Sequence, residues 1–181
     1  LMYAAAGGHT AICKLLIDKN ADVNKKHKQG GTAMLEAATN GTMAVVDLLL
    51  SAGADPLIVD DDGVTALMSS ASQGHVEICK LLVEKGVPVN KAAHSGGTAI
   101  MFAAGGGHNS TVQYLLEQGA DVNVVVKATP EYIMQVEEAL AEGRDDVEPH
   151  KDGVTALMVA AQGGHLETIR MLVEAKAEVD V

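Results

Sequence analysis

The phrase Gly-x-Thr-Ala occurs four times in the 181-residue chain, at Gly30–Ala33, Gly63–Ala66, Gly96–Ala99 and Gly153–Ala156. The threonines are 33, 33 and 57 residues apart, so the last interval is one 33-residue period with an insertion. A fixed period of this length is typical of proteins built by stacking one supersecondary unit. Because each unit of such an array packs only on its neighbours, the phrase predicts one elongated domain.

The second unit shows the local structure that the period predicts. Residues 25–31 are polar with two glycines, which indicates a turn, and the hydroxyl of Thr32 can cap the helix that follows. A short helix is expected over 33–39 and a second over 42–51. The second helix has apolar residues at helical spacing, which predicts one buried stripe: Val45, Leu48 and Leu49.

A unit made of a turn, two antiparallel helices, Gly-His between them and Gly-Ala-Asp-Val-Asn at its end resembles the ankyrin repeat. The resemblance implies an all-α ankyrin-repeat solenoid with β-turn or hairpin loops. It divides the chain into a partial repeat 1–24, repeats 25–57, 58–90 and 91–123, an insertion 124–147 and a repeat 148–181.

The first helices depart from the family's Thr-Pro-Leu-His pattern in every unit. Alanine replaces proline, and the histidine position holds Leu35, Met68, Met101 and Met158. We therefore expect apolar packing in place of the family's Thr-to-His hydrogen bond between units.

The insertion is predicted to contain an amphipathic helix. Thr129-Pro130-Glu131 is a strong helix start, and Tyr132 and Ile133 begin a series of apolar residues at helical spacing. Two interpretations stay open: this helix packs back on the array, or it contacts a partner, because insertions in repeat arrays often lie on the binding face.

Composition narrows the classes of partner. A net charge of −11 and an aromatic content of 2% argue against nucleic acid, which needs clustered cations and stacking rings. No apolar run is long enough to span a membrane. Cys13 and Cys79 occupy the same repeat position two units apart, too far for a disulfide, so we expect reduced, buried thiols and an intracellular location in an unspecified compartment.

No pattern in the sequence predicts catalysis, a metal site or a cofactor. Four histidines recur at one repeat position, which indicates a structural role: His9, His75, His108 and His165. The acidic stretch 60–63 lacks the alternating spacing of a calcium loop. No phosphate-binding loop or nucleophile elbow is present.

We therefore expect a non-catalytic scaffold or adaptor that binds another protein. Repeats of this family usually bind through the turn tips and the exposed side of the first helices. In this chain those positions, with two from the insertion, are Lys28, Gln29, Asn40, Asp61, Asp62, Gln73, His94, Ser95, Tyr132, Ile133, Lys151 and Asp152. A basic tip at 25–28 should abut an acidic one at 60–63. One further residue per unit lines the inner helix, for which we expect a more buried role: Tyr3, Glu36, Ser69, Phe102 and Val159.

An alternative of another class is a regulatory or targeting segment of a larger multidomain protein, or a structural subunit of a large assembly. The array begins in mid-unit and ends without the polar outer face that a terminal repeat needs, which favours this alternative.

Overall fold

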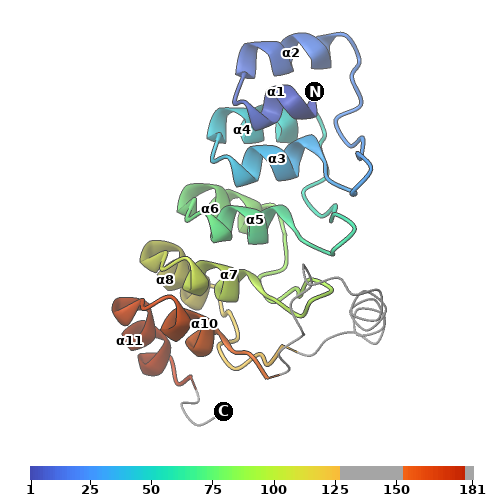
Figure 1. Ribbon diagram of the computed structural model, residues 1–181. Coiled ribbons are helices and arrows are strands. Elements are labelled where there is room, and N and C mark those ends of the chain that lie inside the picture. The colour runs from blue at the N-terminus through green and yellow to red at the C-terminus, as the bar shows by residue number, and fades with distance from the viewer. Residues whose placement is uncertain (127–152, 178–181) are drawn as a thin grey trace, which may run out of the picture.

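The computed structural model describes residues 1–126 and 153–177 and shows helix pairs stacked into an elongated array (Figure 1). The first helices of the pairs are α1 (Met2–Ala6), α3 (Ala33–Thr39), α5 (Ala66–Ser72), α7 (Ala99–Gly105) and α10 (Ala156–Gln162). The second helices are α2 (Thr10–Asp18), α4 (Met43–Ser51), α6 (Val76–Glu84), α8 (Asn109–Glu117) and α11 (Leu166–Glu174). Each helix contacts its counterpart in the next unit, so the two sets form two layers. The all-α solenoid is thus confirmed.

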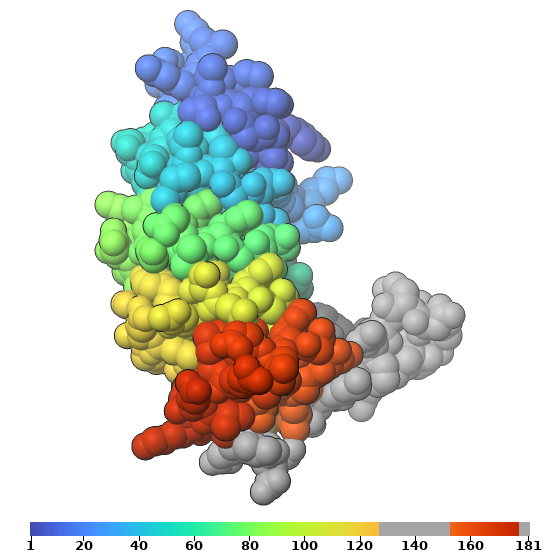
Figure 2. Space-filling model, turned by 90° about the vertical axis from the view of Figure 1, so that its left-hand side faces the viewer, coloured from blue at the N-terminus to red at the C-terminus, as the bar shows by residue number. Residues whose placement is uncertain are grey.

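Successive units form successive bands along the body, and α1–α2 and α10–α11 lie at its opposite ends (Figure 2). The loops that precede the first helices project together from one side of the stack (Figure 1). Among the described residues these loops form turns, with one isolated bridge between Ala92 and Thr98 and no strand. The amphipathic helix expected to begin at Thr129-Pro130-Glu131 falls outside the described residues, and the repeat boundaries remain predictions.

Threonine caps the first helix in three of the four complete units. The hydroxyls of Thr32, Thr65 and Thr155 accept a hydrogen bond from the backbone N–H three residues on, at 3.1–3.4 Å. These bonds satisfy one of the free amides of the first turn. Thr98 also precedes its helix with an extended backbone, but its buried hydroxyl makes no such bond. The repeated sequence therefore fixes where each helix begins, although the fourth unit lacks the side-chain cap.

Small side chains bring the first helices close together. Ala5, Ala38, Ala71 and Ala104 occupy one repeat position and are fully buried where neighbouring units meet. Leucines at another position of the second helices are equally buried, as Leu49 and Leu82 illustrate. The position where the family pattern has histidine is also buried in three units, where it holds Leu35, Met68 and Met101. In the last unit the same position holds Met158, which is 38% exposed. Apolar burial therefore holds the layers together, at about 25 cal/mol per Å² removed from water.

The recurring histidines join neighbouring units. The Nε2 atoms of His75, His108 and His165 lie 3.2, 2.9 and 2.9 Å from carbonyl oxygens at the end of the preceding first helix. Each ring packs on a glycine of that preceding unit with a positive φ, such as Gly41 at 73°, where a side chain would collide with the ring. These contacts satisfy carbonyls that the helix leaves free. The structural role predicted for these three histidines is confirmed.

Asparagines make a second set of bridges at the other side of the units. Asn24 Oδ1 accepts a hydrogen bond from the Asp55 backbone N–H at 2.8 Å, and its Nδ2 donates to Gly53 O at 3.3 Å. Asn90 repeats both bonds with Asp121 N–H and Gly119 O. Each amide therefore binds both a donor and an acceptor of the following unit.

Both cysteines are buried and unpaired, as their shared repeat position predicted. Burial raises the pKa of the Cys79 thiol to about 11 and also raises the pKa of Cys13. A neutral thiol in such surroundings behaves as a small apolar side chain, which fits the valines at the same position in other units. In the described parts of the chain, no helix has both the length and the hydropathy to cross a bilayer.

Candidate protein-binding surface

The loops that precede the first helices, called tips from here on, lie in a row along one edge of the stack. Hydrogen bonds join neighbouring tips, so the row is a ladder. Each tip is closed by its own backbone hydrogen bonds, for example His27 N–H to Gly31 O at 3.0 Å and Asp60 N–H to Val64 O at 3.2 Å. Neighbouring tips are then joined to each other, since Asp61 N–H donates to Gln29 O at 3.2 Å and His94 N–H donates to Asp62 O at 2.8 Å. Four of the predicted binding residues are therefore held side by side by the backbone.

The basic tip abuts the acidic tip, as expected from the repeat register. Among the described residues, no ion pair joins these two tips. Instead, the Lys26 ammonium donates a hydrogen bond to the Val59 carbonyl at 2.7 Å. Lys28, Asp61 and Asp62 remain exposed at the edge of the stack. Exposed charges of this kind add little to stability but can steer a charged partner.

The structure does not bring all of the predicted binding residues together. Asn40 and Gln73 follow the C-terminal ends of α3 and α5, at the opposite end of these helices from the tips. The Asn40 side chain folds back to bond Glu36 O at 2.9 Å. Ser95 lies half-buried in the fourth tip. The predicted residues Tyr132, Ile133, Lys151 and Asp152 lie outside the described residues.

One residue per unit forms an inner row along the first helices. The expectation of a more buried role is wrong for Tyr3, whose side chain is 96% exposed. The other four members are half-buried, namely Glu36, Ser69, Phe102 and Val159. Two of them, Glu36 and Ser69, line a hollow together with residues of the tips. The inner row and the tips therefore form one continuous surface.

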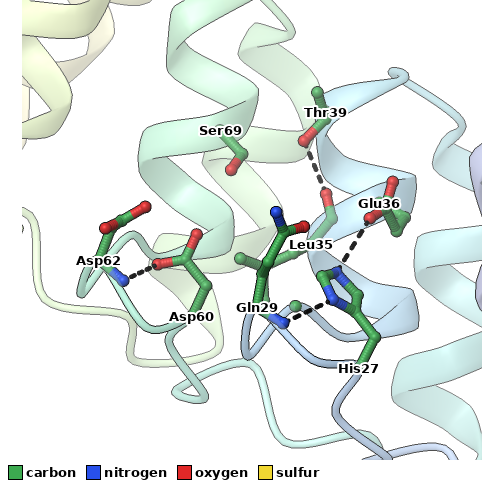
Figure 3. Close-up of a pocket in the computed structure, with 9 residues that line it drawn as sticks. His27, Gln29, Leu35, Glu36, Thr39, Asp60, Asp62 and Ser69 are labelled. Carbon is green, nitrogen blue, oxygen red and sulfur yellow. Dashed lines mark hydrogen bonds and ion pairs between the residues drawn. The ribbon is translucent and has the colours of Figure 1, made fainter. Parts of the chain in front are cut away.

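A hollow of about 310 Å³ opens on this surface between the second and third units (Figure 3). Its described lining comes from two tips and two first helices: His27, Gln29, Gly31, Leu35, Glu36, Thr39, Asp60, Asp62 and Ser69. Gln29 and Asp62 were predicted from the sequence, whereas His27 and Asp60 were not. One signal for His27 in the sequence was Gly31, which stands where the third and fifth units have Val64 and Val154 and the fourth has Gly97. A Cβ on Gly31 would overlap the His27 ring.

Hydrogen bonds fix the polar groups of the hollow. His27 Nδ1 accepts from the Gln29 backbone N–H at 3.0 Å, so the ring proton lies on Nε2, which is 3.7 Å from Glu36 Oε1. Asp60 Oδ1 accepts from the N–H groups of Asp62 and Val64, at 3.0 and 2.8 Å. Nε2 of His27 therefore faces the Glu36 carboxylate at a distance longer than a hydrogen bond.

The described residues do not contain a group of three or more His, Cys, Asp and Glu side chains arranged to hold a metal ion. In the hollow, the Asp60 carboxylate accepts hydrogen bonds from backbone amides, and the Glu36 carboxylate faces the His27 imidazole. The remaining carboxylate oxygens of the hollow can accept hydrogen bonds from a bound group.

Comparison with known proteins agrees with this architecture. The family model for ankyrin repeats in three copies matches residues 1–60 and 36–126, and the model for a single ankyrin repeat matches residues 152–181. No curated protein matched the chain in a separate search.

Proposed function

The chain belongs to the ankyrin repeat family, a family of protein–protein interaction modules, and from this premise we propose that it is a non-catalytic scaffold that binds another protein through its tips and inner row. The ladder of tips is the observation that carries the proposal. Backbone hydrogen bonds between Gln29 and Asp61 and between Asp62 and His94 place exposed side chains of three units in a fixed order. A surface that is already ordered loses little entropy when a partner binds.

The character of this surface also supports a protein partner. It combines charged tips with the aromatic side chains of Tyr3 and Phe102, and aromatic residues are enriched among those that contribute most to protein interfaces. A net charge of −11 disfavours nucleic acid. The sequence extends the proposed surface to Tyr132 and Ile133 of the insertion and to Lys151 and Asp152 of the last repeat.

The proposal is tested by capture of partners from the native source followed by mass spectrometry. One bait is the unchanged chain, and a second reverses three tip charges with Lys28→Glu, Asp61→Lys and Asp62→Lys. A matched control reverses exposed charges on the second helices with Lys14→Glu, Glu84→Lys and Glu174→Lys. A fourth bait lacks residues 128–146.

We expect the tip variant to lose partners that the control variant keeps, and any partner lost with residues 128–146 to identify a contribution of the insertion. Retention of every partner by both the tip variant and the deletion variant would contradict the proposal.

A further inference from the structure

The inner groove consists of the hollow between α3 and α5 together with the apolar side chains of Phe102 on α7 and Val159 on α10. Its charged part has three carboxylates, those of Glu36, Asp60 and Asp62. Of the described residues that line the hollow, only His27 can carry a positive charge, and its Nδ1 is occupied by the Gln29 N–H. The hollow therefore has uncompensated negative charge.

The size and shape of the hollow limit what can occupy it. At about 310 Å³ it lies at the lower end of the range for ligand sites, which suits one long side chain better than a cofactor. The Ser69 hydroxyl at its wall donates no hydrogen bond to any described residue and can accept or donate one. An arginine head group matches this lining, because its planar fork can pair with separate acceptors and stack on a ring such as that of His27.

An independent feature lies further along the groove. The Phe102 ring packs on Gly97 of its own tip, since a Cβ on Gly97 would lie 3.2 Å from the ring. Val159 of the following unit lies beside Gly105, where a Cβ would be 3.8 Å from the valine Cβ. Both side chains are half-buried, so an apolar shelf continues the row on which Glu36 and Ser69 lie. A partner that spans both parts needs a cation and an apolar side chain.

We infer that the inner groove binds an extended segment of a partner protein in which a cationic side chain, preferably arginine, enters the hollow and an apolar side chain about four residues away covers Phe102. This inference rests on the proposed function and names the chemistry of the partner. Adjacent helices pack about 8–10 Å apart, which places the hollow about 12–15 Å from α7. An extended chain rises about 3.3 Å per residue, so about four residues cover this distance, and residues four apart point to the same side.

The test uses the whole chain labelled with ¹⁵N and four peptides with a Gly/Ser background. The first peptide carries Arg and Leu four residues apart, and the second replaces Arg with citrulline, which has nearly the same shape but no charge. The third replaces Leu with Gly, and the fourth places Arg and Leu three residues apart. Each is titrated at low and high salt and followed by NMR.

We expect the first peptide to shift the amide signals of Glu36, Ser69 and Phe102. The citrulline peptide should bind at least about tenfold more weakly, the size expected for a charge-assisted hydrogen bond. Glu36→Gln and Asp62→Asn should each weaken the arginine peptide at least about threefold, whereas Glu84→Gln on the second helix of the third unit should not change it. Replacing Leu with Gly, or placing Arg and Leu three residues apart, should weaken binding and leave the amide signal of Phe102 unshifted.

Equal binding of the arginine and citrulline peptides, or no shift at Glu36 and Ser69 with any peptide, would overturn the inference. The scaffold function is judged separately, by the captured partners. If reversal of the tip charges releases a partner that Glu36→Gln retains and the arginine peptide does not displace, the scaffold stands and the inferred chemistry is wrong. If every bait retains every partner, the scaffold proposal also fails.

Discussion

Leu57 and Pro88 stand at two repeat positions that a hydrogen bond joins elsewhere in the array. In that bond an asparagine side chain at the first position accepts from the backbone N–H of the second. In the preceding interface Asn24 Oδ1 accepts from Asp55 N–H, and in the following one Asn90 Oδ1 accepts from Asp121 N–H. Leucine has no side-chain amide and proline has no backbone N–H, so neither partner of this hydrogen bond is present between the second and third units. The two changes match: no asparagine is left without its donor. Leu57 is instead 49% exposed.

Restoring both residues should therefore stabilise the array more than restoring either one. Leu57→Asn supplies the acceptor and Pro88→Asp supplies the N–H, and we expect a coupling of about 1 kcal/mol in the free energy of unfolding. Urea unfolding of the unchanged chain, the two single variants and the double variant gives this value. Additivity of the two single changes to within about 0.3 kcal/mol would show that no bridge has formed.

A histidine at position 42 should stabilise the junction between the first two units. Thr42 lies where the other complete units have His75, His108 and His165, and it packs on Gly8 as those rings pack on their glycines. By register, Ala6 O is the counterpart of Thr39 O, which lies 3.2 Å from His75 Nε2. We expect Thr42→His to raise the free energy of unfolding by about 1 kcal/mol.

The control for this change is Thr42→Phe, which supplies a ring without a hydrogen-bonding nitrogen. A gain of the same size in both variants would assign the effect to ring packing rather than to the bond with Ala6 O. Thermal and urea unfolding give the free energy of unfolding of both variants and of the unchanged chain.

Two buried threonines at one repeat position should respond oppositely to valine. Thr111 is fully buried and its hydroxyl has no hydrogen-bond partner, whereas the hydroxyl of Thr168 donates to Asn109 Oδ1 at 2.6 Å. An unpaired buried hydroxyl is costly, so Thr111→Val should stabilise the chain by up to about 1 kcal/mol. Thr168→Val should destabilise it by about 1 kcal/mol, because it removes a bond made in the folded state.

Val45 and Ile78 already occupy this position in the second and third units, which shows that an apolar side chain fits there. Equal effects of the two valine substitutions in urea unfolding would contradict the difference in hydrogen bonding.

The sequence predicted the features that repeat, because each copy of a pattern reports the same contact. Thr32 as a cap and a structural role for His75 follow from period and residue type alone, whereas the bond of His75 to the preceding unit is seen only in the structure. The hollow did not follow, since it requires His27 and Glu36 of one unit to meet Asp60 of the next, and neither Glu36 nor Asp60 recurs at its repeat position. Tyr3 was misjudged for a related reason: periodicity shows which residues share a face, but not whether a neighbour covers that face.

Ionisation of Cys79 should weaken the fold at high pH. The thiol is fully buried, its Sγ lies 3.1 Å from Ser70 Oγ, and burial raises its pKa to about 11 from a value near 9 in the unfolded chain. The folded chain therefore holds this proton more tightly, so the contribution to stability is complete below about pH 9 and is lost as pH rises toward 11.

In a Cys13→Val background, the free energy of unfolding of the chain with Cys79 should fall by up to about 3 kcal/mol relative to Cys79→Val between pH 8 and pH 11. Valine is the matched substitution because Val46 and Val112 are buried at the same repeat position. Comparing the two chains removes the titration of lysines and tyrosines that they share. A difference in unfolding free energy that stays constant from pH 8 to pH 11 would show that burial does not hold the Cys79 thiol neutral.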